Sequence, residues 1–129
     1  MKIEEKETKP RYGIVSFERR RYRRFIVRLP IEYYQVNSRI NQTGQTLNAS
    51  EGGLEVLFSE QIEIGQHLRA KLFFSSGPEL NAIKILVEVV WMNDHLAEGE
   101  RYYRSGVKFI EISPEDSDKL EKFLSSLSQ

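Results

Sequence analysis

The sequence predicts a mainly β protein: a small six-stranded antiparallel β-barrel with one amphipathic α-helix at its C-terminal end. Two features predict this fold. Apolar residues recur at every second position in several short segments separated by turn-forming residues, a pattern typical of half-buried strands. Near the C-terminus the apolar spacing becomes that of a helix. Short strands at regular spacing followed by one terminal helix suggest a barrel with the helix packed on it.

The first half of the chain contains two segments with strand-like alternation. Residues 27–34 alternate between apolar and more polar side chains, and Pro30 within this run suggests an edge strand or a bulge. Residues 37–44 form a polar turn region. The alternation resumes over residues 54–58, so we expect the polar, glycine-containing segment 48–53 to lie between two strands.

The second half contains three further strands. Residues 68–74 place every second apolar side chain on one face, and the Ser-Ser-Gly-Pro segment at 75–78 predicts a reversal of the chain. Residues 82–92 carry β-branched side chains at alternate positions and predict the longest strand. Residues 93–100 are expected to form a polar loop before the last strand over 102–112.

A C-terminal helix is expected over residues 114–127. Ser113 is a suitable N-cap, Pro114 stands at the first helical position, and Asp116 supplies the acid of a capping box. We expect the helix to pack one apolar stripe against the barrel. The stripe consists of Leu120, Phe123, Leu124 and Leu127.

The composition is that of a single soluble domain. Of the 129 residues, 40% are hydrophobic and 29% are charged, and a domain commonly has about 100 to 150 residues. Residues 1–17 are polar without a sustained period, so we expect a flexible leader before a barrel domain at 18–127. Because the chain has no cysteine, no signal-peptide pattern and no membrane-spanning apolar run, we expect a cytoplasmic protein.

The basic residues are distributed unevenly along the chain. No acid lies within residues 19–28, whereas from residue 29 onward acids outnumber bases by fifteen to nine. Such a cluster requires an anionic partner, and arginine can fork onto phosphate oxygens or the O6/N7 edge of guanine and stack on a base. The cluster consists of Arg19, Arg20, Arg21, Arg23, Arg24 and Arg28.

A second polar element follows the first predicted strand. In the segment Asn48-x-Ser50-x-x-Gly53 an amide and a hydroxyl can meet the donors and acceptors of a purine. Gly52 and Gly53 allow a close approach of the ligand and a positive φ. A ligand with both guanine and phosphate would satisfy the two elements together.

The two elements resemble, in this order, the signature of the PilZ domain family, bacterial receptors for the second messenger cyclic di-GMP. That signature is an Arg-x-x-x-Arg pair before the first strand and (Asp or Asn)-x-Ser-x-x-Gly between the next two. Residues 28–33 look like the family's first strand and residues 105–109 like its closing strand. The resemblance covers residues 18–127 and implies a split-barrel type of fold. It also implies a receptor that is not an enzyme, with cyclic di-GMP as ligand and no cofactor.

By this resemblance, Arg20 and Arg24 would grip guanine bases and phosphates, Asn48 and Ser50 would read a guanine edge, and Gly53 would permit close approach. The family's loop often begins with aspartate. Asparagine removes a charge that could accept hydrogen bonds from guanine N1–H and N2–H, so a lower affinity is expected.

Arg19 is a further ligand-binding candidate, and Arg23, Trp91, Gly52 and Gly106 are weaker ones. Arg19, by similarity to members with an arginine there, implies binding of a stacked ligand dimer. Arg23 gives a second register of the arginine pair, with Arg19 as its first member. Trp91 is in phase with the apolar face of its strand, so we expect it in the core or at the barrel rim, although a Trp at a strand end can also stack on a base. Gly52 and Gly106 complete the candidates.

Two other functions remain open. One is a small-barrel binder of single-stranded nucleic acid with a basic arm. The other is a PilZ-like adaptor in motility or pilus assembly that never binds nucleotide. An unknown downstream protein partner is expected for the receptor.

Metal and enzyme chemistry find no support in the sequence. His67 and His95 have no second ligand residue at metal spacing and are expected at the surface. Asp94, Glu98 and Glu100 have no apolar surroundings that would raise a pKa, so a solvated loop explains them. No Ser-His-Asp set, phosphate-binding loop or dinucleotide fingerprint is present, and we therefore expect no enzyme and no metal site.

Overall fold

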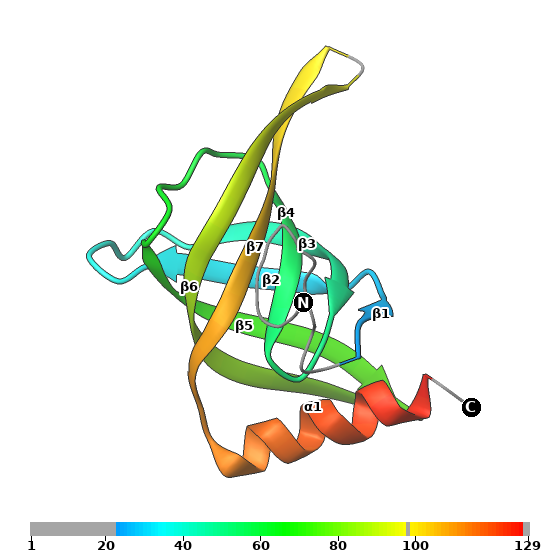
Figure 1. Ribbon diagram of the computed structural model, residues 1–129. Helices are drawn as coiled ribbons and strands as arrows, with labels where there is room; N and C mark the ends of the chain where they lie inside the picture. The colour runs from blue at the N-terminus through cyan, green and yellow to red at the C-terminus, as the bar shows by residue number, and fades with distance from the viewer. Residues whose placement is uncertain (1–22, 98, 128–129) are drawn as a thin grey trace, which may run out of the picture.

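The computed structural model of the chain describes residues 23–97 and 99–127. Figure 1 shows how the elements are arranged. In chain order they are β1 (Phe25–Ile26), β2 (Pro30–Gln35), β3 (Gln42–Ala49), β4 (Gly53–Phe58), β5 (His67–Ser76), β6 (Glu79–Ala97), β7 (Glu100–Ile112) and α1 (Pro114–Ser126).

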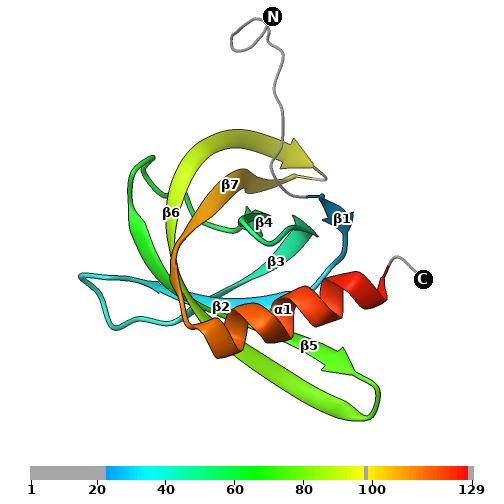
Figure 2. The same ribbon diagram turned by 60° about the horizontal axis from the view of Figure 1, so that its bottom comes forward.

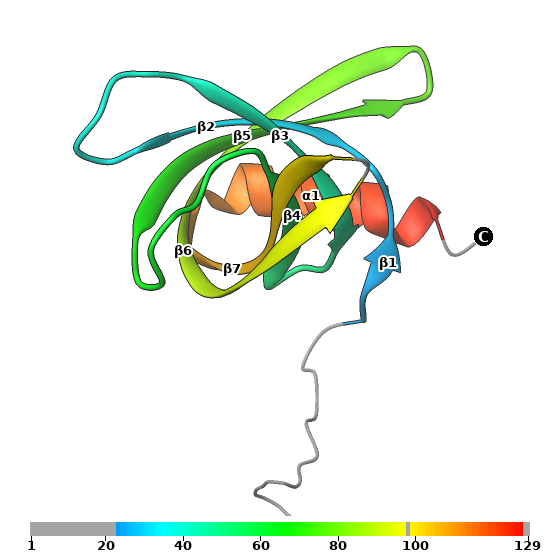
Figure 3. The same ribbon diagram turned by 90° about the horizontal axis from the view of Figure 1, so that it is seen from above.

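Six strands close into an antiparallel barrel. Neighbouring strands follow the order β3, β2, β5, β6, β7 and β4, and the pairing of β3 with β4 closes the ring. The two-residue β1 pairs with the end of β3 and lies outside this ring (Figure 3). The predicted six-stranded barrel with a C-terminal helix is therefore confirmed, and β1 is an additional strand. The turn expected over residues 37–44 is wrong in its last part, because β3 begins at Gln42, and β3 is the barrel strand that the sequence pattern did not predict.

The barrel core is formed by every second residue of the strands. In β4, Leu54, Val56 and Phe58 are each at most 1% exposed. The ring of Phe58 packs edge-on against that of Tyr33 in β2, with 4.7 Å between the ring centroids. The residue between two inward-facing neighbours must point outward, because side chains alternate along a strand. This alternation decides which residues can form a site on the outside.

The helix α1 covers one end of the barrel (Figures 1 and 2). Leu120 and Leu124 are buried, and Phe123 stacks on Phe74 of β5 with 4.5 Å between the ring centroids. Leu127 stands at the C-cap and is 41% exposed. The predicted stripe is confirmed for its first three members, since the helix ends before Leu127 can turn toward the barrel.

The start of α1 follows the predicted capping pattern. The Ser113 Oγ accepts a hydrogen bond from the Asp116 backbone N–H at 3.0 Å, and Pro114 is the first helical residue. The Asp116 carboxylate accepts a further bond from the backbone N–H of Lys84 in β6, also at 3.0 Å. The acid expected in a capping box thus ties the helix to the barrel.

The polar loop expected at residues 93–100 is wrong, because β6 and β7 continue into this segment. Their pairing extends to Ala97 and Glu100. Gly99 has a φ of 80°, a value that glycine adopts easily in a tight turn. The two strands form a ribbon that projects beyond the barrel (Figure 1). The polar side chains of this segment indicate solvent exposure, but they do not indicate whether its backbone pairs in a sheet.

The strand expected over residues 27–34 begins only at Pro30, and residues 27–29 link β1 to β2. Between the two strands, Thr46 Oγ1 donates to the carbonyl oxygen of Val27 at 2.7 Å and accepts from the backbone N–H of Leu29 at 2.8 Å. Pro30 then opens β2, which lies between β3 and β5 within the barrel. The suggested edge or bulge is therefore wrong. A proline is tolerated at the first position of a strand, where its missing N–H breaks no ladder.

Candidate functional site

One row of paired residues crosses the outer face of the barrel. Asn48 of β3 pairs with Glu55 of β4, Glu55 pairs with Gly106 of β7, and Gly106 pairs with Trp91 of β6. Directly paired residues share a face of the sheet. The neighbours of Glu55 in β4 point into the core, so this row faces outward. We call Asn48, Glu55, Gly106 and Trp91 the outer row.

Arg24 reaches the outer row directly. Its Nη1 donates a hydrogen bond to Asn48 Oδ1 at 2.8 Å. The pairing of β1 with β3 makes this contact possible, because Ile26 lies opposite Asn48. The second arginine of the predicted pair thus meets the first residue of the predicted loop motif. Arg19 and Arg20, the other strong arginine candidates, lie outside the described residues.

Arg23 makes a different contact. Its guanidinium carbon lies 5.1 Å from the centroid of the Phe25 ring, a distance typical of a cation–π interaction. The contact with Asn48 belongs to Arg24. This difference favours the register that pairs Arg20 with Arg24 over the register that ends at Arg23.

Glu55 is a nearly buried carboxylate in the centre of this surface, only 9% exposed. Its Oε1 accepts a hydrogen bond from Asn48 Nδ2 at 2.6 Å, and its Oε2 accepts one from Nε of Arg104 in β7. Burial by itself raises the pKa of Glu55. Hydrogen bonds from Arg104 and Asn48, together with the charges of Arg104 and Arg24, outweigh burial, and the pKa lies below its ordinary value. Glu55 is therefore ionised at neutral pH.

Ser50 closes the turn between β3 and β4. Its Oγ accepts hydrogen bonds from the backbone N–H groups of Gly52 at 3.1 Å and Gly53 at 3.2 Å, and donates to the Gly53 carbonyl oxygen at 3.3 Å. Ser50 is 4% exposed. These bonds use the donor and both acceptor positions of the hydroxyl. In this structure Ser50 shapes the turn, and its hydroxyl would have to exchange one of these bonds to contact a ligand.

Neither Gly52 nor Gly53 has a positive φ, so that expectation is wrong. The described glycines with positive φ are Gly65, Gly77 and Gly99. Gly53 is needed for a different reason: a Cβ added there would lie 2.5 Å from the backbone oxygen of Val107 in β7. The close approach of β4 to β7 excludes a side chain at this position.

Trp91 does not lie in the core, which is one of the two places that its phase suggested. The pairing of β6 with β7 shifts register between Val89 and Trp91. The extra residue in β6 turns Trp91 to the outer face, where it is 37% exposed. Its indole covers Gly106, since a Cβ added to Gly106 would overlap the indole Nε1. These two weaker candidates therefore place an exposed aromatic ring in the outer row, with Gly106 between it and Glu55.

Two residues of this surface were missed by the sequence analysis, Glu55 and Arg104. The only signal for Glu55 is its phase in β4, which predicts an outward side chain, and an outward acid is ordinarily solvated. Its burial depends on β3 and β7 flanking β4 in the closed barrel. No local sequence pattern predicts that β4 lies between β3 and β7.

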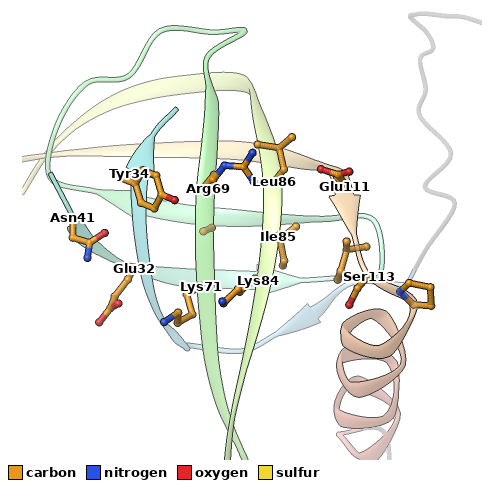
Figure 4. A pocket seen from close by; sticks show the side chains of 13 residues that line it. Glu32, Tyr34, Asn41, Arg69, Lys71, Lys84, Ile85, Leu86, Glu111 and Ser113 are labelled. Atoms are coloured by element: carbon orange, nitrogen blue, oxygen red, sulfur yellow. The ribbon is translucent and has the colours of Figure 1, made fainter. Parts of the chain in front are cut away.

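A groove among the described residues is at a different place. It lies on the outer surface of β2, β5 and β6 near the start of α1 and has a volume of about 820 Å³ (Figure 4). Bases and acids both line it, including Arg69, Lys71, Lys84, Glu32 and Glu111. It contains none of the outer-row residues. We place the candidate site at the outer row, because Arg24 and Asn48 of the two predicted motifs meet there and the groove has mixed charge.

Metal binding finds no support in the described part of the chain, which contains no group of three His, Asp or Glu residues able to hold an ion. His67 lies beside Glu88, with 3.1 Å between Nε2 and Oε1, and its side chain is 42% exposed. It is a surface residue, as expected. The described helix is not long and apolar enough to cross a membrane.

Comparison with known proteins connects this chain to a family. The family model described as PilZ domain matches residues 18–126. Among solved structures, the chain is similar to the inhibitor of motility MotI of Bacillus subtilis, with 18% identity and a TM-score of 0.73 over 87% of this chain and 52% of that one. It is similar to the PilZ domain of YcgR from Escherichia coli with c-di-GMP, with 14% identity and a TM-score of 0.68 over 86% of this chain and 92% of that one.

A third similar structure is the complex of K. pneumonia MrkH with c-di-GMP, with 20% identity and a TM-score of 0.71 over 86% of this chain and 53% of that one. At such identities the likeness establishes the fold alone. The chain spans about half the length of MotI and MrkH. No curated protein sequence matches it.

Proposed function

The chain belongs to the PilZ domain family, and on this basis we propose that it is a non-enzymatic receptor for cyclic di-GMP. One observation carries the proposal: Arg24 Nη1 lies 2.8 Å from Asn48 Oδ1. Each of these residues comes from a different motif segment. A guanidinium and an amide side by side are complementary to a ligand that contains both phosphates and guanine edges.

We place the ligand on the outer face at the outer row. Arg24 would bind a phosphate or the O6/N7 edge of a guanine, and Asn48 would contact a guanine edge. The exposed indole of Trp91 offers a stacking surface for a base. Ser50 and Gly53 would act on the ligand through the shape and backbone of the turn they form.

The arginine segment is proposed to complete the site from the other side of the ligand. Arg24 anchors this segment at the outer row, and Arg20 lies four residues before it. When Arg20 also binds the ligand, the segment closes over it and changes the surface available to a partner protein. Arg19 would add contacts to a second, stacked ligand molecule.

Calorimetric titration with cyclic di-GMP tests the proposal. Losing a charge-assisted contact costs about 1.5 to 3 kcal/mol, so Arg24→Ala is expected to weaken binding at least about tenfold. Arg39→Ala is the matched control, because Arg39 is exposed in the turn between β2 and β3 and should bind as the wild type does. Equal affinities of the Arg24→Ala and wild-type proteins would refute the assignment. The stoichiometry distinguishes a single ligand from a stacked dimer.

The same titrations separate the two other functions. A binder of single-stranded nucleic acid would lose affinity steeply with salt and would not prefer cyclic di-GMP to an oligonucleotide. A nucleotide-independent adaptor would give no binding signal with either. The excess of acids after residue 29 opposes the nucleic-acid alternative, and the contact of Arg24 with Asn48 opposes the adaptor.

A further inference from the structure

A chain of hydrogen bonds with a defined direction runs through Asn48 and Glu55 of the outer row. Arg24 donates to Asn48, Asn48 donates to Glu55, and Arg104 donates to Glu55 from the opposite side. Carboxylate oxygens of an ionised acid only accept, and guanidinium groups only donate. Asn48 is the one member of this chain that could face either way, because its amide has a donating and an accepting end.

Glu55 decides that orientation. With Oε1 of Glu55 at 2.6 Å, the side of the Asn48 amide that faces β4 must be its Nδ2. The Oδ1 of Asn48 is then forced toward Arg24 and the open outer face. A flipped amide would place two acceptor oxygens against each other and two donors together, and both contacts would be lost.

We infer that Glu55 is a positioning residue that makes Asn48 present its Oδ1 to the ligand, so that the site selects a base edge carrying hydrogen-bond donors. Guanine has such an edge in N1–H and the N2 amino group. Arg24 occupies one lone pair of Asn48 Oδ1 and leaves the second for the base. Asn48 then acts toward guanine as an acceptor. This inference rests on the proposed function and adds the origin of its base selectivity.

Burial strengthens the orienting effect. Glu55 is 9% exposed, and a buried carboxylate that loses a partner is costly. Breaking the bond to Asn48 would leave Oε1 without its donor, so the orientation of the amide is held firmly. Arg104 holds the second oxygen and keeps the carboxylate from turning away.

The alternative role for Glu55 is structural: an ion pair with Arg104 that ties β4 to β7. Different substitutions preserve the two roles. A structural ion pair needs a charge at position 55. An orienting role needs an acceptor at position 48, which an aspartate supplies without help from Glu55.

The test compares the wild-type protein with Glu55→Gln and with the double variant Asn48→Asp/Glu55→Gln, which has the same total charge as the wild type. Affinities are measured for cyclic di-GMP and for its hypoxanthine analogue, cyclic di-IMP, which lacks the N2 amino group. Glu55→Gln can offer its own amide in either orientation. It is expected to lose about tenfold in affinity for cyclic di-GMP and part of the preference over cyclic di-IMP.

The double variant is expected to regain both the affinity and the preference, because the carboxylate of the new aspartate accepts whichever way it turns. If it binds as weakly as Glu55→Gln, Glu55 acts only through Arg104 and the inference is overturned. Unchanged selectivity in Glu55→Gln overturns it as well. If Glu55→Gln does not fold, the double variant decides alone. A double variant without preference for cyclic di-GMP over cyclic di-IMP overturns the inference, because an acceptor at position 48 would then not set the base selectivity. A wild-type protein that does not bind cyclic di-GMP would instead refute the proposed function.

Discussion

At the scale of single residues, the site depends on a carboxylate that is both buried and charged. Glu55 keeps its charge because Asn48 and Arg104 each donate a hydrogen bond to one of its oxygens. A buried ion of this kind is costly when any partner is removed. The outer row is therefore a coupled unit, and substitutions in it should not be read as independent contacts.

The lowered pKa of Glu55 predicts a pH dependence of stability. Folding lowers this pKa, so the ionised group stabilises the protein above its ordinary pKa of about 4.3. That contribution is lost as the pH falls through the folded-state pKa. We expect the difference in free energy of unfolding between the wild type and Glu55→Gln to be constant from pH 7 to about pH 5 and to shrink below about pH 4.3.

Urea unfolding of the two proteins at pH 7, 5 and 3.5 measures this difference. The other acids are common to both proteins, so their titration cancels in the comparison. A difference that stays constant over the whole range would show that Glu55 does not titrate with a lowered pKa.

At the scale of elements, the turn between β3 and β4 sets the geometry of the site. Ser50 folds the turn onto itself, and Gly53 lets β4 lie close against β7. This approach brings Glu55 next to Arg104, because Glu55 lies on β4 and Arg104 lies on β7. The motif segment thus builds the surface on which the ligand is proposed to lie.

Gly53→Ala is expected to destabilise the protein even without ligand. The added Cβ would meet the Val107 backbone oxygen at 2.5 Å, and backbone can yield only by moving the strand. Overpacking of this kind costs about 1 to 3 kcal/mol, measured by urea unfolding of the ligand-free protein. Glu51→Ala, exposed in the same turn, is the control and should leave stability nearly unchanged. A variant as stable as the wild type would mean that Gly53 is needed only for the ligand.

At the scale of the whole molecule, the barrel keeps the outer row together while the helix covers one end of the core (Figure 2). The outer row spans four strands, β3, β4, β7 and β6. Its residues stay in place only as long as the barrel is closed. Ligand binding at this row should therefore stabilise the entire fold and not a local segment.

This coupling predicts a ligand-dependent stability. A ligand that binds the folded state alone adds RT ln(1 + [L]/Kd), or about 2.7 kcal/mol at a ligand concentration of 100 Kd. Thermal unfolding of the wild type should rise in midpoint with cyclic di-GMP, whereas GMP at the same concentration should have a smaller effect. Arg24→Ala at the ligand concentration used for the wild type is expected to show little rise. An equal rise in both proteins would contradict binding at the outer row.

Much of the fold follows from local patterns in the chain. The alternation in β4, β5 and β6 predicts buried faces, and Ser113 with Pro114 predicts the helix start; the structure confirms both. These features depend on residues close in sequence, whose periodicity and capping chemistry are local. Arg24 and Asn48 can also be identified as candidates from the sequence, because the arginine pair and the Asn-x-Ser-x-x-Gly segment occur in the order of the family signature.

Other features were decided by the tertiary structure alone. A register shift between β6 and β7 turned Trp91 outward, and the close approach of β4 to β7 required Gly53. Closure of the barrel brought Asn48, Glu55 and Arg104 together. The sequence by itself determined most of the strand segments, with β3 as the main exception, and which groups could bind a guanine-bearing anion. Only the pairing of strands far apart in the chain decided which side chains share a surface, because register and closure arise from contacts that no local pattern encodes.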